Sequence, residues 1–139
     1  MKLQTVKHTI DTRGNTHIVD ITPIVIGELE KSKLVNGNIC IFIPGSTASV
    51  TTIEYEPGLL KDLPEILESI IPSGKPYHHN KTWGDNNGHS HIRAAFFGSS
   101  LNVPFQNGEL MLGIWQQIVI IDFDERSRKR NFVIQLIGE

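Results

Sequence analysis

The pattern of apolar and polar positions predicts strands at both ends of the chain. Residues 2–10 and 16–21 alternate between apolar and polar side chains, and the turn-forming residues 11–15 between them predict a hairpin. Residues 38–43 form a near-continuous apolar run, which is typical of a central strand buried on both faces. Residues 49–56 are rich in β-branched side chains. Further strands are expected at 101–105, 109–112, 114–122 and 131–137, with a hairpin turn at Asn107-Gly108.

Three segments favour helices. Thr22 followed by proline is a typical helix start, and an imperfect apolar stripe follows it. The clearest helix covers residues 59–71, where leucine and isoleucine recur every three to four positions, although Pro64 lies inside it. A short helix is expected over 90–98, with its first residue as the cap. Residues 74–90 show no periodicity, so we expect a long functional loop there.

These elements predict one α+β domain over residues 1–139, with a mostly antiparallel or mixed sheet and two to three helices. A hydrophobic content of 39% in 139 residues supplies a core and argues against disorder. Thirteen basic and 15 acidic residues give a net charge of −2, so we expect no nucleic-acid partner. No apolar run approaches the roughly 20 residues needed to cross a bilayer, so no membrane partner is expected.

The single cysteine and the N-terminus both bear on localisation. Cys40 lies in the apolar run and is expected to be a small buried side chain, since it has no intramolecular disulfide partner. The first residues lack the apolar region of a signal peptide. Together these features favour a reducing, cytoplasmic environment.

Histidines concentrate in the aperiodic segment. Four of the six fall within 14 residues: His78, His79, His89 and His91. Neutral imidazole is the commonest protein metal ligand, so the cluster is a candidate open metal site, although a histidine-rich surface loop would look the same. The carboxylates that could join it are Glu54, Glu56 and Asp85, of which Glu54 is favoured because its strand could end near the loop.

Two short glycine and hydroxyl stretches are candidate anion cradles. Ser46-Thr47 follows the apolar run directly, and Ser99 follows the end of the 90–98 helix. Arg93 is placed to add a bidentate contact to an anion. Neither stretch is a phosphate-binding loop of known type, so ordinary turn chemistry is the competing interpretation.

Several of these motifs together resemble the secondary thiamine-phosphate synthase family. The resemblance rests on Ser46-Thr47-Ala48-Ser49, Tyr77 with His79, Ser90-His91-Ile92-Arg93-Ala94, Gly98-Ser99-Ser100-Leu101, Pro104, Gly108, Gly113-Ile114-Trp115-Gln116-Gln117-Ile118 and the terminal Gln135-Leu136-Ile137-Gly138-Glu139. It implies an α+β fold, a compact homotrimer and a divalent metal, with zinc as the first candidate. The implied reaction joins an aminopyrimidine diphosphate to a thiazole phosphate and releases pyrophosphate, and the word "secondary" in the family name leaves room for a different main reaction.

The resemblance also assigns roles to residues. His79 and His91 match two metal-binding histidines of the family. Many members carry a third histidine where this chain has Gly45, and we infer that His89 replaces it. On the first hypothesis these three histidines hold the metal of a transferase. Phosphate oxygens are bound by Ser46, Thr47, Arg93 and Ser99, and the catalytic residues are Arg93 with Asp85 or Glu54.

Two other functions remain open from the sequence. One is a zinc-assisted hydrolase of a small phosphorylated substrate, and the other is a trimer that binds a metal or small ligand without catalysis. We expect one pocket that contains His79, His89, His91, Arg93, Ser46 and Thr47, with Glu54 or Asp85 on its wall. We also expect a homotrimer with Trp115 and the strand 114–121 near or in its interface, because the many strands leave edges to cover.

Overall fold

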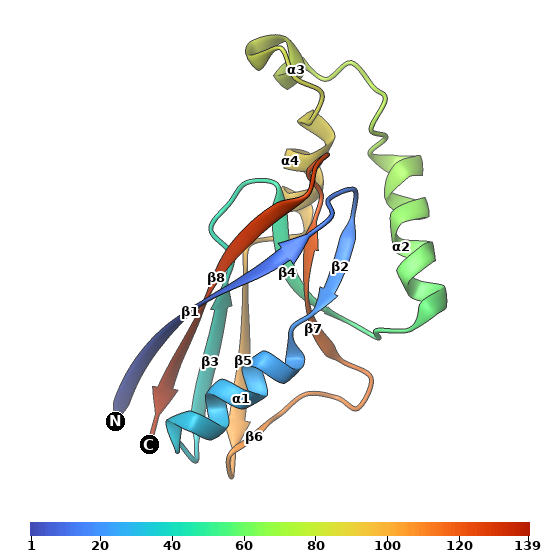
Figure 1. Cartoon of the computed structure of the whole chain (residues 1–139). Helices are drawn as coiled ribbons and strands as arrows, with labels where there is room; N and C mark the ends of the chain where they lie inside the picture. Colours follow the sequence, from blue (N-terminus) through green and yellow to red (C-terminus); the bar gives the residue numbers. More distant parts are fainter.

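The computed structural model describes all 139 residues as two antiparallel sheets and four helices (Figure 1). In chain order the elements are β1 (Lys2–Thr12), β2 (His17–Asp20), α1 (Thr22–Ser32), β3 (Gly37–Phe42), β4 (Ala48–Ile53), α2 (Pro57–Ile70), α3 (His78–Trp83), α4 (Gly88–Phe97), β5 (Ser100–Gln106), β6 (Glu109–Leu110), β7 (Gln117–Asp122) and β8 (Arg128–Gly138). The α+β class expected from the sequence is confirmed. None of the four helices combines the length and the apolar character that crossing a bilayer requires.

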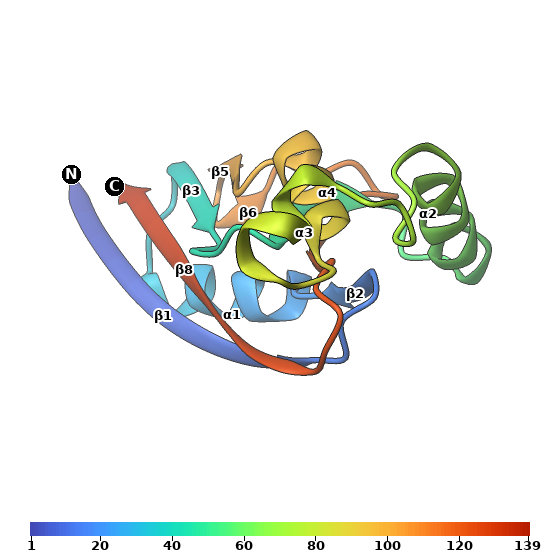
Figure 2. The same cartoon turned by 90° about the horizontal axis from the view of Figure 1, so that it is seen from above.

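The larger sheet has the order β1-β8-β3-β5-β6 and the smaller one β2-β7-β4. β1 and β8 pair along their full length, from Lys2 opposite Gly138 to Thr12 opposite Arg128, and they sweep together in one curve (Figure 2). The expected hairpin of residues 2–10 with 16–21 is therefore wrong. β1 pairs with an 11-residue strand from the other end of the chain, whereas the four-residue β2 pairs with β7.

The main core lies where α1 packs against the larger sheet and β7. Ile21, Val25 and Leu29 of the α1 segment meet fully buried isoleucines of β3, β7 and β8. Full burial of one such side chain contributes about 1.5–3 kcal/mol. β3 alternates, however: Ile39 and Ile41 are buried while Cys40 and Phe42 are partly exposed. The expectations of a strand buried on both faces and of a buried Cys40 are therefore wrong, because α1 covers only one face.

α2 forms where the periodicity predicts a helix and lies beside the smaller sheet (Figure 1), against which it packs Leu67, Leu60 and Leu63. The Glu56 side chain accepts hydrogen bonds from the first free N–H groups, and the helix continues through Pro64. Only Leu67 is buried, whereas Ile66 and Ile70 are 58% and 64% exposed. The helix is therefore attached by a small apolar face, and polar contacts add to it.

Residues 74–90 are not one long loop. They contain α3, which has no buried residue and therefore no apolar period for the sequence to reveal. α4 begins at Gly88, two residues earlier than expected, and Ser90 is not its cap. The Ser90 side chain is instead buried, and its hydroxyl donates to the Phe123 carbonyl.

Candidate functional site

Two of the clustered histidines meet between α3 and α4. The His79 and His91 ring centroids are 4.3 Å apart, with 40° between the ring planes. Asp85, in the turn between the two helices, places Oδ1 3.3 Å from His79 Nδ1. The contact is a close approach and not a hydrogen bond, since His79 Nδ1 has no hydrogen-bond partner. Asp85, His79 and His91 therefore form a contiguous series of proton-accepting groups.

The surroundings of His91 keep its imidazole neutral near pH 7. Burial is the main cause that lowers its pKa, and the neighbouring His79 lowers it further. The carboxylates of Asp124 and Asp85 and the Ser46 backbone oppose this shift without reversing it. A neutral His91 has one ring nitrogen free to accept a proton or a hydrogen bond.

A cleft of about 370 Å³ opens directly beside His91. Its walls come from the β3–β4 connection, from α4 and from the turn into β5, and they include the hydroxyl-bearing Ser46 and Ser99. The remaining lining side chains are glycine or alanine, namely Gly45, Ala48, Ala94, Ala95 and Gly98. Small side chains leave room for a ligand, and the hydroxyls and the imidazole give it polar partners.

Thr47 does not line this cleft but is buried in the loop that forms part of its wall. It is buried, and its hydroxyl contacts Arg130 Nη2 at 2.7 Å and Asp124 at 3.2 Å. Arg130 also forms a bidentate pair with the fully buried Asp122. This charge network fixes the loop that presents Ser46, so Thr47 has a structural contact where the sequence predicts a ligand contact.

His89 and Arg93 face a different pocket on the other side of α4. Arg93 is 4% exposed, and its guanidinium donates to the Ile71 carbonyl, to Thr16 and to Glu68. These bonds tie α2 and the β1–β2 connection to α4. The expectation of one pocket holding all the histidines together with Arg93 is therefore wrong, because α4 separates the two groups.

Glu54 is also remote from the histidines. It is exposed just after β4 and lines a hollow of about 360 Å³ with Tyr55 and Trp115. No three His, Cys, Asp or Glu side chains are arranged so that they could hold a metal ion. The residues present therefore do not fit the three-histidine zinc site, since His89 points elsewhere. A divalent metal at His79 and His91 stays a prediction.

Comparison with known proteins places the chain in a family. The family model described as "UPF0047 protein YjbQ-like" matches residues 6–139. A UPF0047 protein of Methanothermobacter thermautotrophicus is 36% identical over 139 residues, covering 100% of this chain and 95% of the relative. A UPF0047 protein of Archaeoglobus fulgidus is 34% identical over 125 residues, covering 90% and 95%.

This chain belongs to the YjbQ-like UPF0047 family. Solved structures agree with this conclusion. A hypothetical protein of Aeropyrum pernix K1 superposes with a TM-score of 0.91 at 32% identity, covering 98% of this chain and 99% of that one. A YbjQ-like protein of unknown function from Sulfolobus solfataricus P2 superposes with a TM-score of 0.89 at 29% identity, covering 99% and 100%.

The family match corrects the resemblance drawn from the motifs. The chain matches the UPF0047 family, and none of these relatives is described as a thiamine-phosphate synthase. The assignment to a secondary thiamine-phosphate synthase family was therefore wrong, and the transferase and zinc-hydrolase hypotheses have no support from these relatives. The solved relative from Sulfolobus solfataricus P2 is itself described as a protein of unknown function.

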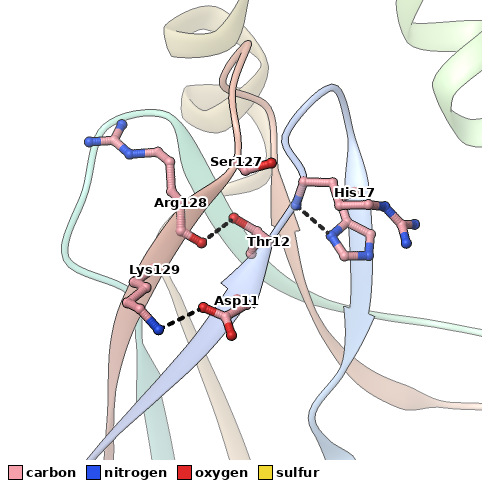
Figure 3. A pocket seen from close by; sticks show the side chains of 7 residues that line it. Asp11, Thr12, His17, Ser127, Arg128 and Lys129 are labelled. Atoms are coloured by element: carbon pink, nitrogen blue, oxygen red, sulfur yellow. Dashed lines mark hydrogen bonds and ion pairs between the residues drawn. The ribbon is translucent and has the colours of Figure 1, made fainter.

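A second hollow of this UPF0047 protein is larger but less suited to a ligand. It measures about 580 Å³ and lies beside Thr12 and Ser127 (Figure 3). Most of its charged groups already have partners: Lys129 pairs with Asp11 at 3.1 Å and the Arg128 side chain pairs with Asp124, whereas Arg13 forms no ion pair. In Figure 3 the Arg128 guanidinium also points away from His17. The cleft beside His91 is therefore the better candidate site.

Sequence reasoning missed the buried network beneath that cleft. Asp122 and Asp124 stand at the end of the apolar run of β7, and Arg130 lies near the start of β8. The signal was present, because a carboxylate that ends a fully apolar strand must be paired when it is buried. The partner's identity required the strand pairing, which the sequence pattern does not specify.

Proposed function

We propose that the cleft beside His91 binds a small phosphorylated molecule, and that His91 exchanges a proton with it. The observation that carries the proposal is the convergence of His91, Ser46 and Ser99 on one cleft of about 370 Å³. This volume falls within the range of roughly 300–1,000 Å³ typical of small-molecule sites. The hydrogen bond of His91 to the Ser46 backbone adds the orientation that an acid–base group needs.

The chemistry follows from the charges of the groups present. The Ser46 and Ser99 hydroxyls donate hydrogen bonds to phosphate oxygens, and such bonds to a charged group are stronger than neutral ones. The neutral His91 accepts a proton from a hydroxyl or from a protonated phosphate of the bound molecule. The Asp85 and Asp124 carboxylates stabilise the positive charge that then forms on His91, because they favour its protonated state.

Titration of inorganic phosphate and phenyl phosphate into the protein at pH 7 tests the binding. We expect saturable binding of both anions, with chemical-shift changes centred on Ser46, His91 and Ser99. Ser46→Ala and Ser99→Ala should each weaken it about tenfold, since each removes a hydrogen bond to a charged group. Ser69→Ala is the matched control, because Ser69 is exposed on α2 and bonds only within its own helix.

The proton exchange is tested separately. His91→Gln keeps a polar side chain and the phosphate contacts of both serines but removes the titrating group. We expect anion binding to retain its strength near pH 7 and to lose the pH dependence that His91 confers. Absence of phosphate binding, or equal affinity in both serine variants and the wild type, would disprove the proposed site.

A further inference from the structure

We propose that Arg130 binds the phosphate group of the ligand directly, through the one nitrogen of its guanidinium that the chain leaves free. That nitrogen is Nη1, and it faces an open space at Gly45, which lines the cleft beside His91. The inference rests on the proposed function and deepens it, because it adds a cationic donor to the cleft. It also narrows the ligand to a molecule with a terminal phosphate.

The Arg130 guanidinium is held in place by bonds that use every donor except those of Nη1. The residue is 6% exposed. Nε and Nη2 donate to the two carboxylate oxygens of Asp122, each at 2.8 Å, and Nη2 also donates to the Thr47 hydroxyl at 2.7 Å. A guanidinium carries five N–H groups, so the two on Nη1 remain without an acceptor in the chain.

Nη1 is accessible although the rest of the side chain is buried. The buried side-chain nitrogens and oxygens without a hydrogen-bond partner are three histidine nitrogens, and Arg130 Nη1 is not among them. Because Nη1 also lacks a partner, it must keep contact with solvent. A guanidinium fixed by a fully buried aspartate, with one accessible nitrogen to spare, is a preorganised donor for an anion.

Gly45 provides the space in which a ligand oxygen can reach Nη1. Apart from the adjacent residues, Nη1 is the only atom within 4 Å of the point where a Cβ would lie, and it is 3.2 Å away. This separation lies within the range of N–H···O hydrogen bonds. Gly45 has a φ of 154°, which residues with a side chain rarely adopt, so its conformation keeps the space open.

The loop around Gly45 offers more donors than acceptors. The backbone N–H groups of Gly45, Ser46 and Thr47 take part in no hydrogen bond of the chain. The nearby carboxylates are already engaged, Asp122 by Arg130 and Asp124 by Arg128. Excess donors with no free carboxylate favour an anion. A terminal phosphate brings three free oxygens to these donors, whereas a phosphodiester brings two.

A conservative variant tests the contribution of Arg130. Arg130→Lys keeps a positive charge beside Asp122 but has one nitrogen in place of three, so none remains to face Gly45. We expect it to weaken the binding of inorganic phosphate about ten- to a hundredfold, the effect of losing hydrogen bonds to a charged group. Arg128→Lys is the matched control and should leave phosphate affinity unchanged, because Arg128 pairs with Asp124 and does not line the cleft.

Nuclear magnetic resonance of the arginine guanidinium nitrogens tests the contact in the natural protein. Saturation with phosphate should shift the Arg130 Nη1 signal, whereas potassium chloride at equal ionic strength should not. An arginine that only supports the loop would not give this response. Phenyl phosphate should produce the same shift, and dimethyl phosphate should bind at least tenfold more weakly than phenyl phosphate.

The outcomes separate this inference from the proposed function. Phosphate binding that Ser46→Ala weakens, with an unmoved Arg130 Nη1 signal, would overturn the role of Arg130 and leave the cleft proposal standing, whatever the affinity of Arg130→Lys. Absence of phosphate binding to the natural protein would overturn both. If Arg130→Lys fails to fold, the Nη1 signal decides alone. Equal affinity for phenyl and dimethyl phosphate would overturn the assignment of a terminal phosphate.

Discussion

Replacing Arg93 with alanine distinguishes a structural arginine from an anion-binding one. Its guanidinium is buried and donates to the Ile71 carbonyl through Nε at 3.1 Å and Nη2 at 2.7 Å, to Thr16 at 3.2 Å and to Glu68 at 2.8 Å. α2 also packs Leu67 beside Ala94 of α4, and the Arg93 side chain adds the polar link between the two helices. We therefore expect Arg93→Ala to destabilise the protein and leave phosphate binding intact.

The size of the effect follows from burial. Removing one partner of a fully buried, hydrogen-bonded charge pair costs about 3–5 kcal/mol. The Glu68 side chain is 51% exposed, so water replaces part of its interaction and the pair contributes less. The Ile71 carbonyl loses both of its Arg93 donors, which adds the cost of an unsatisfied buried acceptor. The expected loss in the free energy of unfolding is about 2–4 kcal/mol, since these contributions overlap.

Urea unfolding followed by circular dichroism measures this loss. With a slope of about 1–3 kcal/mol per molar urea, 3 kcal/mol moves the midpoint by about 1–3 M. Arg13→Ala is the matched control, because Arg13 is exposed and forms no ion pair, and we expect its midpoint to shift little. A loss below about 1 kcal/mol for Arg93→Ala, or a folded variant with weakened phosphate binding, would refute the structural role.

Three further predictions concern stability and assembly. Burial acts to raise the pKa of Asp122, but hydrogen bonds from Arg130, Thr12 and the Asp124 backbone lower it overall. The stability that this lowered pKa contributes is present above the pKa of the unfolded state and is lost as the pH falls through the pKa of the folded state. Asp122→Asn should therefore reduce the fall in the free energy of unfolding that acid causes. Gly37→Ala should lower the free energy of unfolding by about 2 kcal/mol or more, because its Cβ would lie 2.1 Å from the Ile137 carbonyl oxygen. Gly74→Ala should hardly change it, because nothing lies within 4 Å of a Cβ there. Light scattering should give three times the 15.6 kDa chain mass, as expected of a homotrimer that covers the 67% exposed Trp115; a monomer mass would contradict this.

The sequence reveals those elements that have a periodic buried face or a local turn motif. The helix at 59–71 and the turn at Asn107-Gly108 were expected and are present, because each depends on neighbouring residues only. Strand pairing depends on residues far apart, and nothing in residues 2–10 shows that β8 is the partner. α3 escaped detection because a helix without buried residues has no apolar stripe.

The candidate site could be predicted in part, because some of its residues stand out by local composition. The enrichment of histidines pointed to the correct segment, and the structure does bring His79, His91 and Asp85 together. Ser46 and Ser99 also lie at one cleft with His91, although they are separated by more than 50 positions. Local composition could identify these groups, but it could not show on which side of a helix each histidine lies.

That side is decided by where α4 begins. Successive helical residues turn by about 100°, so His89 and His91 point roughly 200° apart once both are inside the helix. Residues 91, 94, 95 and 98 then share the face that lines the phosphate cleft, at the spacing i, i+3, i+4 and i+7. His89 and Arg93, four apart, share the other face. Had the helix begun at residue 90, His89 would have remained free to turn toward His79. Its start at Gly88 directs His89 to the side of α4 that holds Arg93, away from the cleft beside His91.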